Sequence, residues 1–220
     1  MKDNYTDLTI VIPCRAGSTR VKNKNFKPFS NTTLLENKVK QAKTLNAKIV
    51  INSDSIVAKQ IAEDNGIEFV QRPAYYASSE CINSEYYDYL GNSVDTKYIM
   101  ILQPTAPLIK DATVKSCVDS FYDNIDEYDS LVTADYSKKF AWYNGKPINY
   151  DIANMPNSQD LDPIIMPTYN VMICKVSELL KAKNVMTPKC LLFEVSDLES
   201  IEIDTPLEFE IAEILYDRNK

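Results

Sequence analysis

Near its N-terminus the chain reads Leu8-Thr9-Ile10-Val11-Ile12-Pro13, an apolar and β-branched run that a proline closes. A run of this kind is typical of a strand buried on both faces of a parallel sheet. Further short apolar runs follow at 47–51, 67–70, 98–102 and 130–133, and segments with helical spacing separate them at 34–45, 56–65, 85–90 and 112–122. This alternation predicts an α/β fold with a Rossmann-like, mostly parallel sheet and helices on both faces.

The stretch 136–169 interrupts the alternation. It has four prolines, many Asn and Asp residues and no periodicity, and it is too long for a passive loop in a compact domain. We predict a single domain over residues 1–220, with 136–169 as an inserted β-ribbon or arm. After it we expect strands at 170–174 and 191–195, a helix at 177–182, and a closing helix from Thr205-Pro206 with Leu207, Ile211, Ile214 and Leu215 on one face.

Composition excludes several function classes. The chain has 220 residues, a net charge of −7, no histidine and only four glycines. The acidic balance argues against nucleic acid as a partner, and the missing histidine excludes Ser-His-Asp triads and His-ligated zinc. Four glycines are too few for a dinucleotide fingerprint or a Walker loop. Five scattered cysteines, no signal peptide and no apolar stretch of ~18 residues predict a reduced cytoplasmic protein without a membrane partner.

The loop after the first predicted strand concentrates positive charge. It reads Cys14-Arg15-Ala16-Gly17-Ser18-Thr19-Arg20-Val21-Lys22-Asn23-Lys24-Asn25. Backbone N–H groups near Gly17 and Ser18 can form an anion nest, and Arg15, Arg20 and Lys24 can neutralise a triphosphate. A solvated basic loop is the alternative interpretation. In open α/β sheets, ligands bind beyond the carboxyl ends of the strands, where this loop is placed.

This loop resembles the signature of the cytidylyltransferases that activate acidic sugars, the CMP-sialate and CMP-Kdo synthetases. It is a hybrid, with the Ser-Thr-Arg of the Kdo branch followed by the Lys-Asn of the sialate branch. Four further stretches match the family in order: Asn52-Ser53-Asp54-Ser55, Arg72-Pro73-Ala74 with Ala77-Ser78, Leu102-Gln103-Pro104-Thr105-Ala106-Pro107-Leu108, and Ile201-Glu202-Ile203-Asp204-Thr205-Pro206-Leu207-Glu208. Together they span nearly the whole chain.

The resemblance implies an enzyme that moves CMP from CTP to a small acidic acceptor, a 2-keto-3-deoxy sugar acid, with release of pyrophosphate. It implies nucleotide binding by Arg15, Ala16, Gly17, Ser18, Arg20, Lys24, Asn25, Ser53, Asp54, Arg72 and Asn83. It implies catalytic roles for Arg15, Arg20, Lys24 and Gln103, and acceptor binding by Gln103, Thr105, Lys139, Tyr169 and Asn170. Because Ile109 and Met166-Pro167-Thr168 stand where the sialate branch has arginines, a phosphonate or another non-sialate acid stays open as the acceptor.

Two acidic residues predict a metal site. Glu202 and Asp204 alternate with isoleucines, so on a strand both carboxylates leave the same face. Beside a triphosphate such a pair suits Mg²⁺, which takes a few carboxylates together with water and phosphate oxygens. For Asp204 the alternative is an N-cap of the closing helix. With no histidine, the base is a carboxylate, a metal-bound hydroxide or the leaving phosphate, and the sequence does not choose among them.

Two further classes of function stay open. A nucleotide-sugar-dependent glycosyltransferase would carry Asp-x-Asp at the end of the central strand, where this chain has Gln103-Pro104-Thr105. A non-catalytic nucleotide-binding subunit is suggested by Thr19, which replaces a sialate-branch lysine, although Arg20 follows it directly. The arm displays Trp142, Tyr143 and Tyr150, an apolar patch of the kind that monomers avoid. With the resemblance, this predicts a homodimer in which Lys138 or Lys139 reaches the acceptor of the neighbour.

Overall fold

A mixed sheet forms the centre of the molecule. The structure is a computed structural model that describes residues 4–219. In this range seven strands pair in the order β11-β7-β10-β6-β1-β4-β5, and β10 runs antiparallel to both of its neighbours. The strands of the sheet are β1 (Tyr5–Cys14), β4 (Ala47–Ser53), β5 (Glu68–Gln71), β6 (Tyr98–Leu102), β7 (Ser130–Ser137), β10 (Ile164–Lys175) and β11 (Cys190–Glu194). The predicted α/β sheet, mostly parallel, is confirmed.

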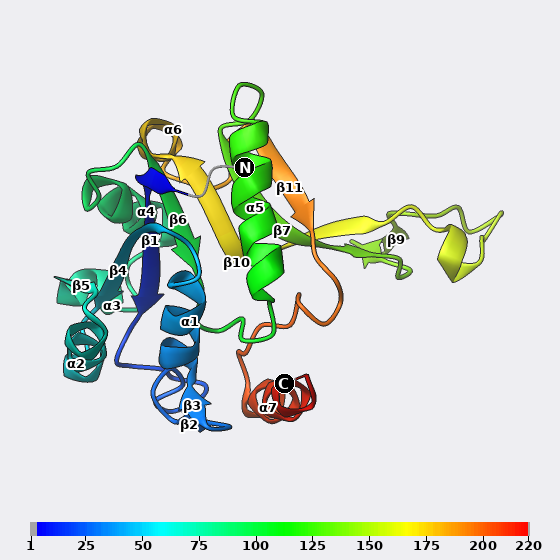
Figure 1. Ribbon diagram of the computed structural model, residues 1–220. Helices are drawn as coiled ribbons and strands as arrows, with labels where there is room; N and C mark the ends of the chain where they lie inside the picture. The colour runs from blue at the N-terminus through cyan, green and yellow to red at the C-terminus, as the bar shows by residue number, and fades with distance from the viewer. Residues whose placement is uncertain (1–3, 220) are drawn as a thin grey trace.

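Helices cover both faces of the sheet. They are α1 (Leu34–Ala42), α2 (Ile56–Asn65), α3 (Ala74–Ala77), α4 (Asn83–Asn92), α5 (Asp111–Asp123), α6 (Val176–Ala182) and α7 (Pro206–Arg218). Figure 1 shows α1 and α5 in front of the sheet and α4 and α6 behind it. The front core takes Ile10, Ile12 and Met100 from the strands, and the back core takes Val11 and Ile101. Successive residues of β1 and β6 therefore enter opposite cores, which explains why these strands are apolar throughout.

The helix boundaries follow local chemistry. Ser55 caps α2, because its side chain accepts hydrogen bonds from the backbone N–H groups of Val57 and Ala58. Gly66 ends the same helix with φ = 63°, a left-handed conformation that glycine adopts without a steric penalty. Parallel strands β1, β4 and β6 end at Cys14, Ser53 and Leu102, so the loops after them meet at one edge of the sheet.

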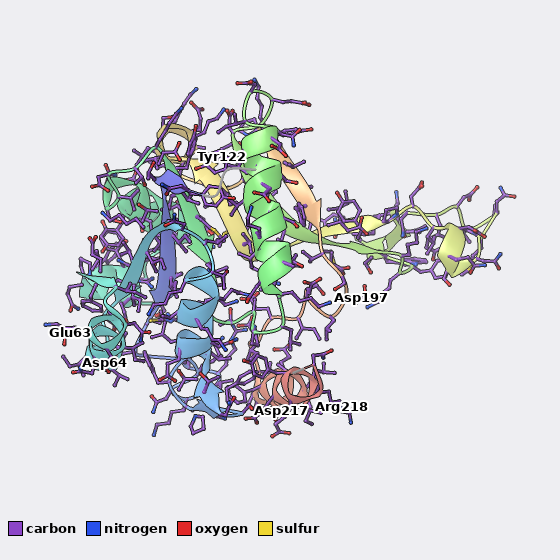
Figure 2. The ribbon with its side chains drawn as sticks, in the orientation of Figure 1. Glu63, Asp64, Tyr122, Asp197, Asp217 and Arg218 are labelled. Atoms are coloured by element: carbon purple, nitrogen blue, oxygen red, sulfur yellow. The ribbon has the colours of Figure 1, made fainter. Side chains whose placement is uncertain are left out.

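The segment between β7 and β10, residues 138–163, lies inside the stretch 136–169 for which an inserted arm is predicted. The two strands stay paired outward to Ser137 and Ile164, and beyond them come β8 (Trp142–Tyr143), β9 (Lys146–Pro147) and a short 3-10 helix (Ser158–Asp160). Figure 1 shows this part standing away from the body of the protein, and Figure 2 shows side chains along its whole length. The base of the arm is thus an extension of two strands of the central sheet, and β8 and β9 pair with each other beyond it.

The closing segment differs from its prediction in two ways. Residues 201–204 are not part of a strand, so Glu202 and Asp204 are placed by a loop. Helix α7 buries Phe209 and Ala212. Of the four residues predicted to share one face, Leu207, Ile211 and Ile214 are exposed, and Leu215 is partly buried against the same cluster. The reason is that α7 packs across the β2–β3 hairpin (Pro28–Phe29 and Thr32–Thr33), where Phe29 meets Phe209 edge-on at 5.4 Å. In Figure 2, Asp217 and Arg218 mark α7 beyond the carboxyl edge, and Tyr122 marks the opposite edge.

Candidate active site

A polar cleft lies at the carboxyl edge of the sheet, where β1 and β6 end. It encloses about 320 Å³ between the loop after β1, the turn after β6 and the segment 72–87. Nine residues singled out from the sequence line it: Arg15, Ser18, Arg20, Lys24, Asn25, Arg72, Asn83, Gln103 and Thr105. The structure therefore brings these nine residues together beyond the carboxyl ends of the strands, where ligands bind in open α/β sheets.

The loop after β1 is held in place from the end of β4. The backbone N–H of Ala16 donates to Asp54 Oδ1 across 2.7 Å. Ser53 is buried, and its Oγ accepts from the N–H of Ser55, so it shapes the turn that carries Asp54. Ala16, Gly17, Ser53 and Asp54 do not line the cleft. Asp54 thus holds the cationic loop of residues 14–25, called the phosphate-type loop below, without lining the cleft itself.

The cations of the loop differ in what they bind. Arg20 Nη2 lies 2.8 Å from Asp204 Oδ1. Lys24 Nζ donates to the carbonyl of Ile203 and lies 3.4 Å from the same carboxylate oxygen. Within residues 4–219 the side chain of Arg15 has neither an ion pair nor a hydrogen-bond partner, although it lines the cleft. Arg15 therefore adds to the cleft lining a positive charge that no acidic side chain of residues 4–219 pairs with.

Asn25 adds an unused acceptor to the cleft wall. Its side chain is buried, and in the described part of the chain Asn25 Oδ1 accepts no hydrogen bond. Its backbone carbonyl accepts from the N–H of Leu35, which ties the loop to the first turn of α1. A buried polar atom without a partner is costly, so a donor on a bound ligand would relieve it.

The turn after β6 positions the acidic pair. Thr105 Oγ1 donates to Glu202 Oε1 across 2.8 Å, and the N–H of Ile203 donates to the carbonyl of Thr105. Desolvation by the surrounding protein raises the pKa of Glu202; the Thr105 hydrogen bond opposes this shift, and the Asp204 carboxylate adds to it. Asp204 is not the N-cap of α7, since Thr205 accepts from the N–H of Glu208 and caps that helix. Both carboxylates are held by residues that line the cleft, Glu202 by Thr105 and Asp204 by Arg20 and Lys24, although neither is itself part of the lining.

An aromatic wall closes the other end of the cleft, and the sequence analysis missed it. The guanidinium of Arg72 stacks over the Tyr86 ring at 3.8 Å, and its Nε donates to the carbonyl of Tyr76. The Tyr76 ring stacks on Tyr89 at 4.1 Å. Tyr76, Tyr86 and Tyr87 line the cleft beside Asn83. The signal was the tyrosine-rich sequence at 75–76 and 86–89, which looks like ordinary core when only its spacing is considered.

Three predicted acceptor residues lie outside the cleft. Asn170 is fully buried, and its Nδ2 donates to the carbonyl of Glu199, so it supports the fold behind the turn. Tyr169, with φ = 56°, places its hydroxyl 3.1 Å from the Met186 sulfur. Lys139 is exposed at the base of the arm, and its backbone carbonyl accepts from Asn149. Ile109 is buried, so it offers the cleft nothing in place of an arginine.

The five cysteines are all free, as the sequence predicts. Cys14 and Cys81 line the cleft, and burial raises the pKa of Cys14 to about 12.

Among residues 4–219, no helix is both long and apolar enough to cross a bilayer. In the same range no cluster of three or more His, Cys, Asp or Glu side chains is arranged to bind a metal.

Known proteins share both the sequence pattern and the fold. A family model described as cytidylyltransferase matches residues 9–189. The chain is 27% identical to post-translational flagellin modification protein B of Campylobacter coli, over 96% of this chain and 95% of that protein. It is 24% identical to the N-acylneuraminate cytidylyltransferase of Escherichia coli O18:K1:H7, over 94% of this chain but 51% of that protein, so it spans about half the length of that relative.

A solved structure supports the same assignment of fold. The structure of CMP:2-keto-3-deoxy-manno-octonic acid synthetase complexed with CTP superposes with a TM-score of 0.70, covering 98% of this chain and all of the other, at 14% identity. At that identity the likeness shows the fold alone. The family model, in contrast, matches most of the chain, from the middle of β1 to the start of β11. The chain belongs to the cytidylyltransferase family.

Proposed function

We propose that this protein transfers CMP from CTP to an acidic sugar, a 2-keto-3-deoxy sugar acid of the sialic-acid or Kdo type, and releases pyrophosphate. One observation carries the proposal: the unpaired Arg15 stands with Arg20 and Lys24 along a cleft that also holds Gln103 and Thr105. Cations on one side suit the triphosphate, and polar groups on the other suit an acceptor. The aromatic wall around Arg72 suits a nucleobase, with Asn83 within the same lining.

In this proposal the residues act by positioning and by charge neutralisation. The anomeric hydroxyl of the acceptor attacks the α-phosphorus of CTP in line, a new P–O bond forms, and the bond to pyrophosphate breaks. Such transfers need little covalent help from the protein. Arg15, Arg20 and Lys24 would bind phosphate oxygens, and Gln103 would orient the acceptor. The chain has no histidine, so the proton of the attacking hydroxyl would pass to a carboxylate or to the departing pyrophosphate.

The acidic pair fits a magnesium ion. Glu202 is held by Thr105, and Asp204 lies against Arg20 and Lys24 beside the phosphate-type loop. Mg²⁺ takes few protein carboxylates and completes its shell with water and phosphate oxygens, so two are sufficient. Glu202 and Asp204 would hold the ion, which when bound neutralises charge on phosphate oxygens. Arg20 and Lys24, released from Asp204, would then turn to the triphosphate.

The identity of the acceptor depends on what the cleft lacks. Relatives act, by their names, on N-acylneuraminate and on 2-keto-3-deoxy-manno-octonic acid. Here Ile109 is buried and no arginine stands at 166–168, so two cationic contacts of the sialate pattern are missing. A phosphonate or another non-sialate acid is therefore the second candidate acceptor. A product of this kind would serve as a donor for polysaccharide synthesis in the cytoplasm, where CTP and free thiols are available.

One experiment tests the proposal. Purified protein with CTP and Mg²⁺ is given a panel of acceptors: Kdo, N-acetylneuraminate, other 2-keto-3-deoxy acids and simple phosphonates. We expect pyrophosphate release with a keto-acid and formation of its CMP ester, with both lost when Mg²⁺ is chelated. Release with a phosphonate alone would select the second candidate. No release with any acceptor, in protein that binds CTP, would leave a non-catalytic nucleotide-binding subunit.

A homodimer is part of the proposal. The arm exposes Trp142 and Tyr143, at 55% and 69% of their surface, and also Ile148, Ile152 and Met155. Exposed apolar side chains gathered on a projecting element are typical of a surface that another protein covers. A second copy of the chain would cover it, and Lys138 or Lys139 at the base of the arm would then reach the acceptor of the neighbour.

A further inference from the structure

A lysine is sealed inside the protein behind the cleft. Lys38, in the middle of α1, has 0% of its surface exposed. Its Nζ donates to Gln41 Oε1 across 2.7 Å and to the backbone carbonyl of Ala106 across 2.8 Å. Ala106 belongs to the turn that carries Gln103 and Thr105 into the cleft. The amine thus reaches from the front helix layer to the back of that turn.

The surroundings of this amine match a neutral group. A neutral amine has two N–H donors, and Lys38 has two acceptors, Gln41 and Ala106. Burial lowers the pKa of Lys38 to about 7, although the nearby Asp111 carboxylate opposes the shift. An apolar side chain of the same length would avoid the desolvation cost of the amine, but it would leave the Ala106 carbonyl and Gln41 Oε1 without this donor. What the amine adds at this position is therefore its hold on these two acceptors.

The hydrogen bonds of α1 continue along the turn. Gln41 Nε2 donates to the carbonyl of Ile109 across 2.8 Å and to Asp111 Oδ1 across 2.9 Å. Lys38 and Gln41 therefore grip two carbonyls of one segment, at Ala106 and Ile109. On the far side of the same turn, Thr105 holds Glu202 through its hydroxyl and Ile203 through its carbonyl. The amine is thus connected to the acidic loop by two hydrogen bonds and by the backbone between the carbonyls of Ala106 and Thr105.

We propose that Lys38 is a positioning residue for the transfer reaction: from inside the fold it fixes the carbonyl of Ala106, and with it the turn that presents Gln103 and Thr105. This inference rests on the proposed function in one respect: that the turn with Gln103 and Thr105 binds the acceptor. The phosphate-type loop is attached to α1 separately, through Leu35 and Asn25. Loss of the amine therefore affects the Gln103 side of the cleft more than the triphosphate side.

The test compares Lys38→Met with Lys40→Met, a matched control at an exposed lysine of the same helix. Pyrophosphate release is measured against CTP and against the acceptor, and amide hydrogen exchange is followed in peptides that cover 103–111. For Lys38→Met we expect kcat/KM for the acceptor to fall ~10-fold or more, with the KM for CTP within ~2-fold. Exchange in 103–111 should accelerate ~10-fold, while α2 exchanges as in the wild type. Lys40→Met should match the wild type in every measurement.

Other outcomes overturn the inference. Wild-type kinetics and wild-type exchange in Lys38→Met would show that the amine positions nothing. Faster exchange throughout the protein, with acceptor and CTP kinetics changed together, would show a role in stability alone. If Lys38→Met does not fold, Gln41→Met is used instead, because it removes the hydrogen bond to the Ile109 carbonyl. It must then lower kcat/KM for the acceptor with little change in the KM for CTP, by a smaller factor than expected for Lys38→Met. If the wild type is inactive with every acceptor, the proposed function fails, and exchange in 103–111 decides the inference by itself.

Discussion

Arg20 and Asp204, 184 positions apart in the chain, are joined by a hydrogen bond of 2.8 Å from Nη2 to Oδ1. Both side chains remain accessible, at 65% and 40% of their surface, so this pair adds little to stability. Its importance is that it connects the phosphate-type loop to the acidic loop. A triphosphate and a divalent cation would compete for the two partners separately, and the pair would then open.

Asp204→Asn should therefore reduce activity and leave the fold intact. We expect a loss of ~100-fold or more in kcat, the scale of removing one electrostatic stabiliser. The free energy of unfolding should change by less than about 1 kcal/mol, because the ion pair is exposed. Steady-state pyrophosphate release and urea unfolding measure the two effects.

Thr205→Ala provides the matched control for Asp204→Asn. Thr205 caps α7, so its loss should cost about 1 kcal/mol of stability. Its kcat should stay within a few-fold of the wild type. Full activity in Asp204→Asn, combined with a loss of stability as large as that of Thr205→Ala, would refute a role of Asp204 in the site.

Arg15→Ala should abolish turnover while the fold survives. Arg15 has no ion pair or hydrogen bond of its side chain within the described residues, so no native contact is lost. The substitution removes the positive charge that would bind a phosphate group, so kcat/KM should fall. Lys22→Ala, at an exposed lysine of the same loop that does not line the cleft, is the control. Equal kcat/KM in Arg15→Ala and Lys22→Ala would rule out the phosphate-binding role.

The stability of the protein should rise with pH through the titration of Lys38. Its pKa is about 7 when folded and near 10.4 when unfolded, so between these values the unfolded chain binds more protons. The free energy of unfolding then increases with pH. From pH 7 to pH 8.5 the wild type should gain about 1–2 kcal/mol relative to Lys38→Met, measured by urea unfolding. A constant difference between the two proteins would mean that the amine is charged in the fold.

The arm should mediate self-association. At micromolar concentration, sedimentation of the intact protein should give a dimer of the 25.0 kDa chain. Replacing Trp142 and Tyr143 by serine removes two exposed apolar side chains from the arm and should shift the equilibrium toward monomer. The same replacement at Ile56 and Val57, exposed on α2, is the control. A monomer that still turns over CTP would contradict the role of the arm.

The sequence predicted the sheet well because its signals are local. The apolar runs of β1 and β6, the cap at Ser55 and the left-handed Gly66 each act within a few residues. The cationic loop was equally visible, since its composition departs from an acidic chain. Helix α7 was assigned the wrong inner face because its partner, the β2–β3 hairpin with Phe29, comes from the other end of the chain.

The residues that support the cleft could not be predicted from the sequence, because their contacts also join segments that are far apart in the chain. Lys38 looks like any helical lysine until the Ala106 carbonyl is placed beside it. Asn170 matched a family motif, yet the fold turns its side chain away from the cleft to the carbonyl of Glu199. Motif matching identifies positions, whereas the direction of a side chain depends on contacts between distant segments.

Strand β10 belongs to two parts of the molecule at once. Its outer half, from Ile164, is a leg of the arm, and its inner half pairs with β6, where the carbonyl of Asn170 accepts from the N–H of Gln103. In the proposed dimer, a second copy bound to the arm and a ligand bound in the cleft would act on one continuous strand. Thermodynamic linkage would make such an effect mutual: if dimerisation helps to order the cleft, a ligand in the cleft would tighten dimerisation by the same free energy. The dissociation constant of that dimer would then report on ligand binding.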